Sequence, residues 1–186
     1  MNVVLLAGSP SSPSRSHALL SHLQHELRRA GALCLTVALR DLPAQALLQA
    51  DVSHADLQAA LARVRDADAV VIATPIYKAA YSGLLKTFLD LLPQDCLAGK
   101  AVLPLATGGS IAHLLAIDYA LKPVLHALGA RHIADAVFVA DPQARLQAGG
   151  HYEFDPAVIE RLDRAVLGVL ELAPRSRRNA LATESI

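Results

Sequence analysis

Short apolar runs alternate with longer segments of helical periodicity along the chain, and this alternation constrains the fold more than any other feature. It is typical of repeated β-α units, which build a parallel sheet. Runs that are apolar at every position suit such a sheet, because helices cover both of its faces. The predicted strands are Val3–Ala7, Leu33–Ala38, Ala69–Thr74, Ala101–Ala106 and Ile133–Val139. We therefore predict an α/β protein with a five-stranded parallel sheet and helices on both faces.

Caps and helix breakers place the helices between these strands. The fourth helix contains Pro123, which we expect to kink or break it. The predicted helices are Ser16–Arg29, Asp56–Arg65, Ser82–Leu92, Ser110–Leu128 and Pro156–Leu172. A flavodoxin-like sheet has five strands with intervening helices, which is the number predicted here. We predict one domain over residues 1–172 and a flexible tail over residues 173–186.

Composition argues against several classes of partner. The 186 residues can share one hydrophobic core, and 17 basic and 17 acidic side chains give no net charge. We therefore expect no nucleic-acid or membrane partner and favour a small-molecule ligand. An apolar fraction of 53% leaves apolar surface for contacts between subunits, so we expect a homo-oligomer.

The cysteines and the first residues bear on metal binding and location. Cys34 and Cys96 lie far apart and have no neighbour at zinc-ligand spacing, which predicts no metal site. The first ten residues carry no Lys or Arg before a short apolar run, so no export signal is predicted. These features predict a cytoplasmic protein with reduced cysteines.

The loop after the first strand, from Gly8 to Ser16, is a candidate phosphate site, because ligands of open parallel sheets bind beyond the carboxyl ends of the strands. It lacks the lysine of a triphosphate-binding loop and the repeated glycines of a dinucleotide turn. Its serine hydroxyls, Arg15 and the free N–H groups of a helix start can hold a phosphate monoester. The alternative is a solvated loop whose last serine caps the helix.

The loop after the third strand offers a flat apolar surface. Pro75 fixes the backbone as it leaves the strand, and Ile76 and Tyr77 follow it. Such a surface suits a planar ring. Tyr81 follows shortly after, and the alternative is that both tyrosines are half-buried core residues or subunit contacts.

The loop after the fourth strand contains two adjacent glycines, Gly108 and Gly109, which let the backbone approach a ligand closely. Ser110 can cap the next helix, in which His113 lies about one turn further on. His113 could face a nicotinamide or the edge of a flavin. The alternatives are an ordinary tight turn and a surface or interface histidine.

Three motifs in these loops resemble the NAD(P)H-dependent FMN reductases, and in particular the reductase components of two-component alkanesulfonate monooxygenase systems. They are A-G-S-P-S-S-P-S-R-S at residues 7–16, A-T-P-I-Y-K-A-A-Y-S-G-L-L-K-T at residues 73–87, and L-P-L-A-T-G-G-S-I-A-H-L-L-A-I-D-Y-A-L-K-P-V-L at residues 103–125. General members of the family have P-E-Y-N where this chain has P-I-Y-K, and this departure favours the sulfonate branch over broad quinone or azo reduction.

The resemblance implies a flavodoxin-like fold, a homotetramer, and FMN reduced by NADPH or NADH. The implied FMN contacts are Ser9, Arg15, Ser16 and His17 on the phosphate side, Pro75, Ile76, Tyr77 and Lys78 on the ring and ribityl side, and Thr107, Gly108, Gly109 and Ser110 at the ring edge. It also implies that Tyr119 accompanies a π-type bulge at the subunit interface and contributes to flavin transfer.

The chemistry implied by the resemblance needs no catalytic side chain, because hydride passes directly from the nicotinamide to the flavin. The reduced flavin would leave and serve a separate alkanesulfonate monooxygenase. Two other functions stay open at this point: a quinone or azo-compound reductase that retains its FMN, and a flavodoxin-type electron carrier. The absence of a strongly acidic charge balance argues against the carrier.

Overall fold

The computed structural model describes residues 1–174 and is built on a mostly parallel sheet. Its strands are β1 (Asn2–Ala7), β2 (Leu33–Ala38), β3 (Ala69–Tyr77), β4 (Ala80–Tyr81), β5 (Ala101–Gly108), β6 (His132–Ile133) and β7 (Val137–Ala140). The parallel strands follow the order β2-β1-β3-β5-β6. The direction of winding reverses between β1 and β3, which makes their carboxyl ends the switch point of the sheet.

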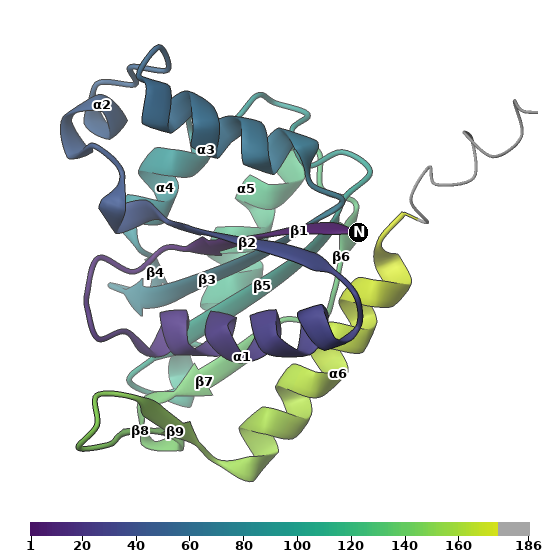
Figure 1. The fold of residues 1–186 in the computed structure, drawn as a ribbon. Helices are drawn as coiled ribbons and strands as arrows, with labels where there is room; N and C mark the ends of the chain where they lie inside the picture. Colours follow the sequence, from purple (N-terminus) through teal and green to yellow (C-terminus); the bar gives the residue numbers. More distant parts are fainter. Residues whose placement is uncertain (175–186) are drawn as a thin grey trace, which may run out of the picture.

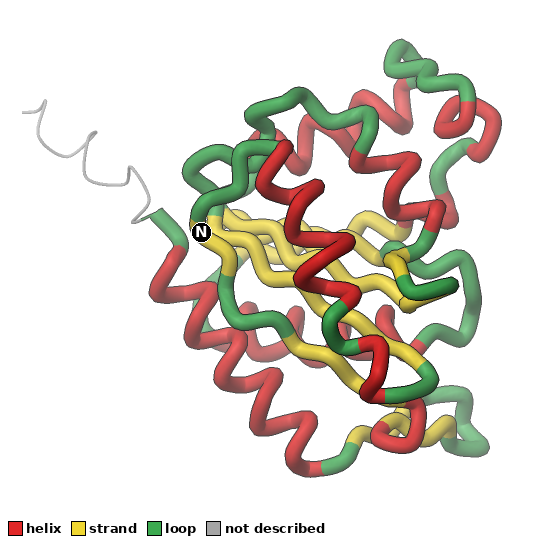
Figure 2. Tube along the Cα trace, turned by 180° about the vertical axis from the view of Figure 1, so that it is seen from behind, coloured by secondary structure: helices red, strands yellow, loops and turns green. Residues whose placement is uncertain are grey.

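Helices cover both faces of this sheet, as predicted. They are α1 (Arg15–Arg29), α2 (Ala44–Leu48), α3 (Ala55–Asp66), α4 (Gly83–Leu89), α5 (Lys122–Ala127) and α6 (Pro156–Leu172). Helices α1 and α6 lie on one face, and α3, α4 and α5 lie on the other (Figure 1). Figure 2 shows from behind that the strands run between helices on either side.

The sheet has seven strands rather than the predicted five. The predicted run Ile133–Val139 is divided, because the chain leaves the ladder around the exposed Asp135; β6 and β7 each pair in parallel with β5. The short β4 adds an antiparallel pair to β3. Lys78 and Ala79, with φ of 51° and 64°, form the turn between them. A two-residue hairpin turn needs positive φ at both of its residues. The sequence has neither glycine nor asparagine at these positions, so it did not predict the turn.

The predicted helix Ser110–Leu128 is also broken. It consists of a 3₁₀ turn, η2 (Ile111–His113), a π-helical turn, η3 (Ile117–Leu121), and α5. Pro123 lies in the first turn of α5, directly after η3. The helical backbone continues from η3 into α5, and the interruption lies earlier, in the turn at Leu114 and Leu115. The break is therefore not at Pro123, and the proline instead lies where π-helical hydrogen bonding changes to α-helical hydrogen bonding.

The two larger hydrophobic clusters hold the layers together, one on each face of the sheet, and a smaller third cluster contains Phe138. In β1, Leu5 packs toward α1 and α6, whereas Leu6 packs toward the opposite helices, as the alternation of side chains in a strand requires. Both side chains are completely buried, as are Phe88 of α4 and Phe138 of β7.

The C-terminal part contains one element that was not predicted, a hairpin of β8 (Ala144–Leu146) and β9 (Tyr152–Phe154). It lies beside the start of α1 (Figure 1). Residues 175–186 of the predicted tail lie outside the described residues. Among residues 1–174, no helix has the length and apolar character needed to cross a membrane.

Candidate functional site

A cavity of about 220 Å³ lies at the carboxyl ends of β1, β3 and β5, the edge that the sequence indicated. All three predicted loops contribute to it. Its lining includes eight of the predicted FMN contacts: Ser9, Arg15, Pro75, Ile76, Tyr77, Thr107, Gly108 and Gly109. It also includes Ser11, Pro13, Ser14, Asp141 and Tyr152, which the predicted contact set omitted.

The other four predicted contacts lie next to the cavity rather than on its wall. Ser16 is buried with its Oγ 3.1 Å from the Oγ of Ser14. Lys78 lies in the turn between β3 and β4. Ser110 caps η2, where its hydroxyl accepts a hydrogen bond from the N–H of Ala112. His17 lines a neighbouring cavity.

The first loop is shaped to hold an anion at the start of α1. Ser14 is the N-cap, and its hydroxyl accepts a hydrogen bond from the N–H of His17 at 3.3 Å. The hydroxyl of buried Ser9 accepts one from the N–H of Ser11 at 3.2 Å. Arg15 follows as the first residue of the helix, so a cation, several hydroxyls and the positive end of a helix dipole meet here.

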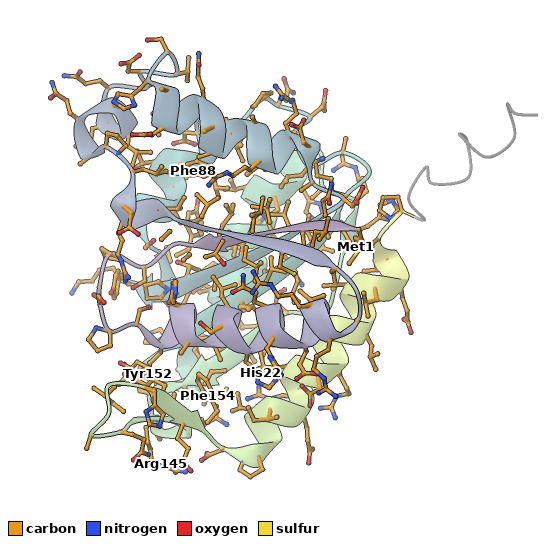
Figure 3. The ribbon with its side chains drawn as sticks, viewed as in Figure 1. Met1, His22, Phe88, Arg145, Tyr152 and Phe154 are labelled. Carbon is orange, nitrogen blue, oxygen red and sulfur yellow. The ribbon has the colours of Figure 1, made fainter. Side chains whose placement is uncertain are left out.

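Arg15 has two partners from the C-terminal part of the chain. Its Nη1 lies 3.2 Å from Oδ2 of Asp141, at the start of the 3₁₀ turn η4 (Asp141–Gln143). Its guanidinium carbon lies 5.5 Å from the centre of the Tyr152 ring in β9. Figure 3 shows Tyr152 beside the first turns of α1. The Nε of Arg15 is buried and has no hydrogen-bond partner among the described residues.

Hydrogen bonds tie the first loop to the second. The N–H of Gly8 donates to the carbonyl of Ala73 at 2.8 Å. The hydroxyl of Ser82, the N-cap of α4, donates to the carbonyl of Gly8. A β-carbon added to Gly8 would lie 3.1 Å from that Ala73 oxygen and 3.0 Å from Cβ of Leu85. A larger residue would therefore have to displace the Ala73 carbonyl or Leu85, so close packing favours glycine where the loop leaves the sheet.

The ring side of the cavity is more open. Ile76 is nearly buried, but 48% of the Tyr77 surface is exposed. Gly108 packs against the Phe138 ring, so that an added β-carbon would lie 3.1 Å from its Cζ, whereas Gly109 has open space. The backbone of the third loop can therefore approach a planar ligand from one side, while solvent reaches the other.

His113 and Tyr119 lie outside the cavity lining. His113 belongs to the 3₁₀ turn η2, not to a long helix, and its buried Nδ1 has no partner within residues 1–174. Tyr119 lies in the π-helical turn η3 and is 59% exposed. Its hydroxyl donates to the carbonyl of Ala79 at 3.4 Å, which connects this turn to the β3–β4 hairpin.

A second cavity, of about 620 Å³, lies on the other side of the first loop and shares Pro13, Ser14 and Tyr152 with the first. His17 lines it, and burial, followed by the nearby Arg40 cation, lowers the pKa of His17 below its usual 6.5, against the opposing effect of Asp41. A neutral imidazole in this place adds no positive charge to the start of α1 at neutral pH.

Asp141 and Tyr152 are lining residues from outside the three predicted loops, and sequence reasoning missed both. Asp141 follows the last strand of the sheet, and the carboxyl end of that strand was a usable signal. Tyr152 reaches the cavity only because the β8–β9 hairpin folds back against α1, and no pattern in the sequence announced this contact. Within residues 1–174, no three His, Cys, Asp or Glu side chains are grouped closely enough to hold a metal ion.

The strand order and the position of the cavity define a flavodoxin-like α/β protein. A family model described as NADPH-dependent FMN reductase matches residues 1–144, and the chain belongs to that family. An FMN reductase (NADPH) of Escherichia coli (strain K12) is 46% identical over 166 residues, which are 89% of this chain and 86% of the relative.

Two further comparisons extend the likeness to NADH-dependent proteins. An NADH-dependent FMN reductase of Pseudomonas putida, SfnF, is 34% identical over 177 residues, covering 89% of each chain. The crystal structure of the apo form of an NADH:FMN oxidoreductase (EMOB) has a TM-score of 0.85 and 41% sequence identity, and the match covers 95% of this chain and 91% of that one.

Proposed function

We propose that this protein binds FMN in the cavity at the carboxyl ends of β1, β3 and β5 and catalyses its reduction by NADPH or NADH. The observation that carries the proposal is the convergence of three sequence-distant loops on one cavity, in a chain of the FMN reductase family. One loop suits a phosphate monoester and the other two suit a flat ring. FMN contains both of these groups.

The residues present fit this ligand. The buried Nε of Arg15 lacks a partner within the described chain, and a phosphate oxygen would supply one. Ser9, Ser11 and Ser14 line the same cavity and carry further hydroxyls. The neighbouring Ser16 and His17 extend this phosphate side at the start of α1.

The isoalloxazine ring would lie against Ile76 and Tyr77, with the backbone of Thr107, Gly108 and Gly109 along its edge. Pro75 contributes to the same wall, while Lys78 and Ser110 flank it, toward the ribityl chain and the ring edge. A bound flavin supplies the hydride acceptor. The protein positions the two reactants, excludes water between them and uses no acid or base, with His113 on the nicotinamide side.

An exposed apolar surface beside the cavity supports a homo-oligomer, which we propose is a tetramer. It contains Ile111, Leu114, Leu115 and Tyr119, each more than 40% exposed, on the segment between β5 and α5. Contiguous apolar side chains of this kind mark contact surfaces. In this proposal Tyr119 and its π-helical turn lie at the subunit interface and assist flavin transfer.

We propose further that the reduced flavin is released and serves a separate, flavin-dependent alkanesulfonate monooxygenase in the cytoplasm. The proposal rests on the P-I-Y-K motif and on the position of Tyr119 in a π-helical turn. π-Helical turns are rare and are frequent at functional sites. A phosphate site whose arginine, Arg15, is already paired with a carboxylate also suits a flavin that leaves as product.

The proposed activity is tested by mixing purified protein with excess free FMN and either NADPH or NADH, and following loss of the reduced nicotinamide. We expect many turnovers per protein molecule, because the flavin exchanges. Turnover with quinone but not with free FMN, together with flavin that stays bound through purification, would instead indicate a retained cofactor. No nicotinamide oxidation with any acceptor would contradict enzymatic function.

A further inference from the structure

Among the described residues, only two charged side chains line the 220 Å³ cavity, and they are paired with each other. They are Arg15 and Asp141, with Nη1 3.2 Å from Oδ2. The remaining lining residues are neutral. An anion entering the cavity therefore meets a cation that already has a carboxylate partner, and the pair carries no net charge.

Each member of this pair is partly exposed, with about two fifths of the side-chain surface open to solvent. A surface ion pair of this kind contributes little to folding. Its position on the cavity wall has a larger consequence, because a carboxylate and a phosphate monoester are both anions and both would face the same guanidinium.

We propose that Asp141 weakens the hold of the cavity on the phosphate of FMN and thereby favours release of the flavin. This inference rests on the proposed function. Asp141 has two opposing effects on binding: it orients Arg15, and it repels the incoming anion. The repulsion is the larger effect, because Arg15 is also oriented by its packing on Tyr152 and by its place in the first turn of α1.

Tyr152 acts as a positioning residue in this arrangement. Its ring lies under the guanidinium, with 5.5 Å between the guanidinium carbon and the ring centre, and it comes from β9, beyond the part of the chain that the family model matches. The flat ring holds the guanidinium by cation–π attraction without competing for its N–H donors. The β8–β9 hairpin thus contributes to a site whose recognised motifs all lie earlier in the chain.

The test compares FMN with riboflavin, which lacks the phosphate, by fluorescence titration at low ionic strength. Asp141→Asn is the main variant and Asp141→Ser the second, in case one of them packs poorly. Asp90→Asn is the matched control, because Asp90 forms an ion pair with Lys86 on α4 and lies outside the cavity. Tyr152→Leu and Tyr152→Phe form a second matched pair.

We expect both Asp141 variants to bind FMN about tenfold more tightly, the size of effect that one like charge at close range has on an ionised group. Riboflavin affinity stays unchanged, and the control matches wild type for both flavins. Tyr152→Leu weakens FMN binding about threefold, and Tyr152→Phe restores it.

Unchanged or weaker FMN binding by both Asp141 variants would overturn the inference, and a shared drop in Tm would then assign Asp141 a structural role. Equal tightening of riboflavin would overturn it as well. In these cases the wild-type protein still binds and reduces FMN. A wild-type protein that neither binds FMN nor oxidises a nicotinamide would instead refute the proposed function, and this inference with it.

Discussion

The two ends of the candidate site are built differently. At the start of α1, the anion end is tied into the protein by hydrogen bonds between loops and by the Arg15–Asp141 pair, and Ser9 and Ser16 are buried. At the ends of β3 and β5, the ring end leaves Tyr77 half exposed and borders the apolar residues of η2 and η3.

This difference matches the different needs of the two parts of the proposed ligand. A phosphate needs donors in fixed places, and these are provided by one helix start and its neighbouring loops. A ring that must receive a second, stacked reactant needs an open face. In the proposed function, the exposed side chains at the ring end would contact the nicotinamide and another subunit.

The largest expected effect is on the anion end. Arg15→Ala should weaken FMN binding about ten- to hundredfold, because a charged hydrogen bond contributes about 1.5–3 kcal/mol, while riboflavin binding is unchanged. Fluorescence titration measures both. Arg29→Ala, at the other end of the same helix and paired with Glu26, is the control. Equal losses for the two flavins would contradict a phosphate role for Arg15.

The close packing behind the anion end is tested by Gly8→Ala. The added β-carbon would press on the Ala73 carbonyl and on Leu85, so we expect a loss of about 1–3 kcal/mol in the free energy of unfolding. Urea denaturation measures it. Gly109→Ala is the matched substitution at the ring end, where space is open, and should leave stability unchanged. Equal stability of both variants would show that Gly8 is no more closely packed than Gly109.

The ring end is tested by Tyr77→Ala, which should weaken FMN and riboflavin alike by about three- to tenfold, the range of an aromatic stacking contact. Tyr77→Phe should retain both affinities, because the ring and not the hydroxyl makes the contact. The same titrations measure them. A loss confined to FMN would place Tyr77 at the phosphate and remove the contrast between the two ends.

The smallest expected effect concerns pH and His17. Its pKa is lowered in the folded state by burial and Arg40, so below pH 6.5 the unfolded chain binds a proton that the folded chain does not. Stability therefore falls as the pH drops below 6.5 toward the folded-state pKa. His17→Gln should reduce the fall in Tm between about pH 7.5 and about pH 5.5. A larger fall in the variant would contradict this sign.

Much of the fold follows from local sequence signals. The predicted strand Leu33–Ala38 and helix Pro156–Leu172 have the observed bounds, because apolar runs and helical stripes act over a few neighbouring residues. The eight predicted contacts that line the cavity could be predicted from the sequence for a related reason. Parallel strands bring their carboxyl ends to one edge of the sheet.

The departures from this pattern could be found only in the folded chain. The β3–β4 turn at Lys78 and Ala79 and the divided fifth strand depend on packing against distant elements, which overrides local preference. The π-helical turn at Tyr119 agrees with the bulge that the family resemblance implied, although helical periodicity alone predicted an ordinary helix there. The pairing of Arg15 with Asp141 and Tyr152 joins residues more than a hundred positions apart, so no local pattern could encode it. Local sequence signals were therefore enough to locate the cavity edge, whereas the charge environment of Arg15 depends on contacts that form only when the chain folds.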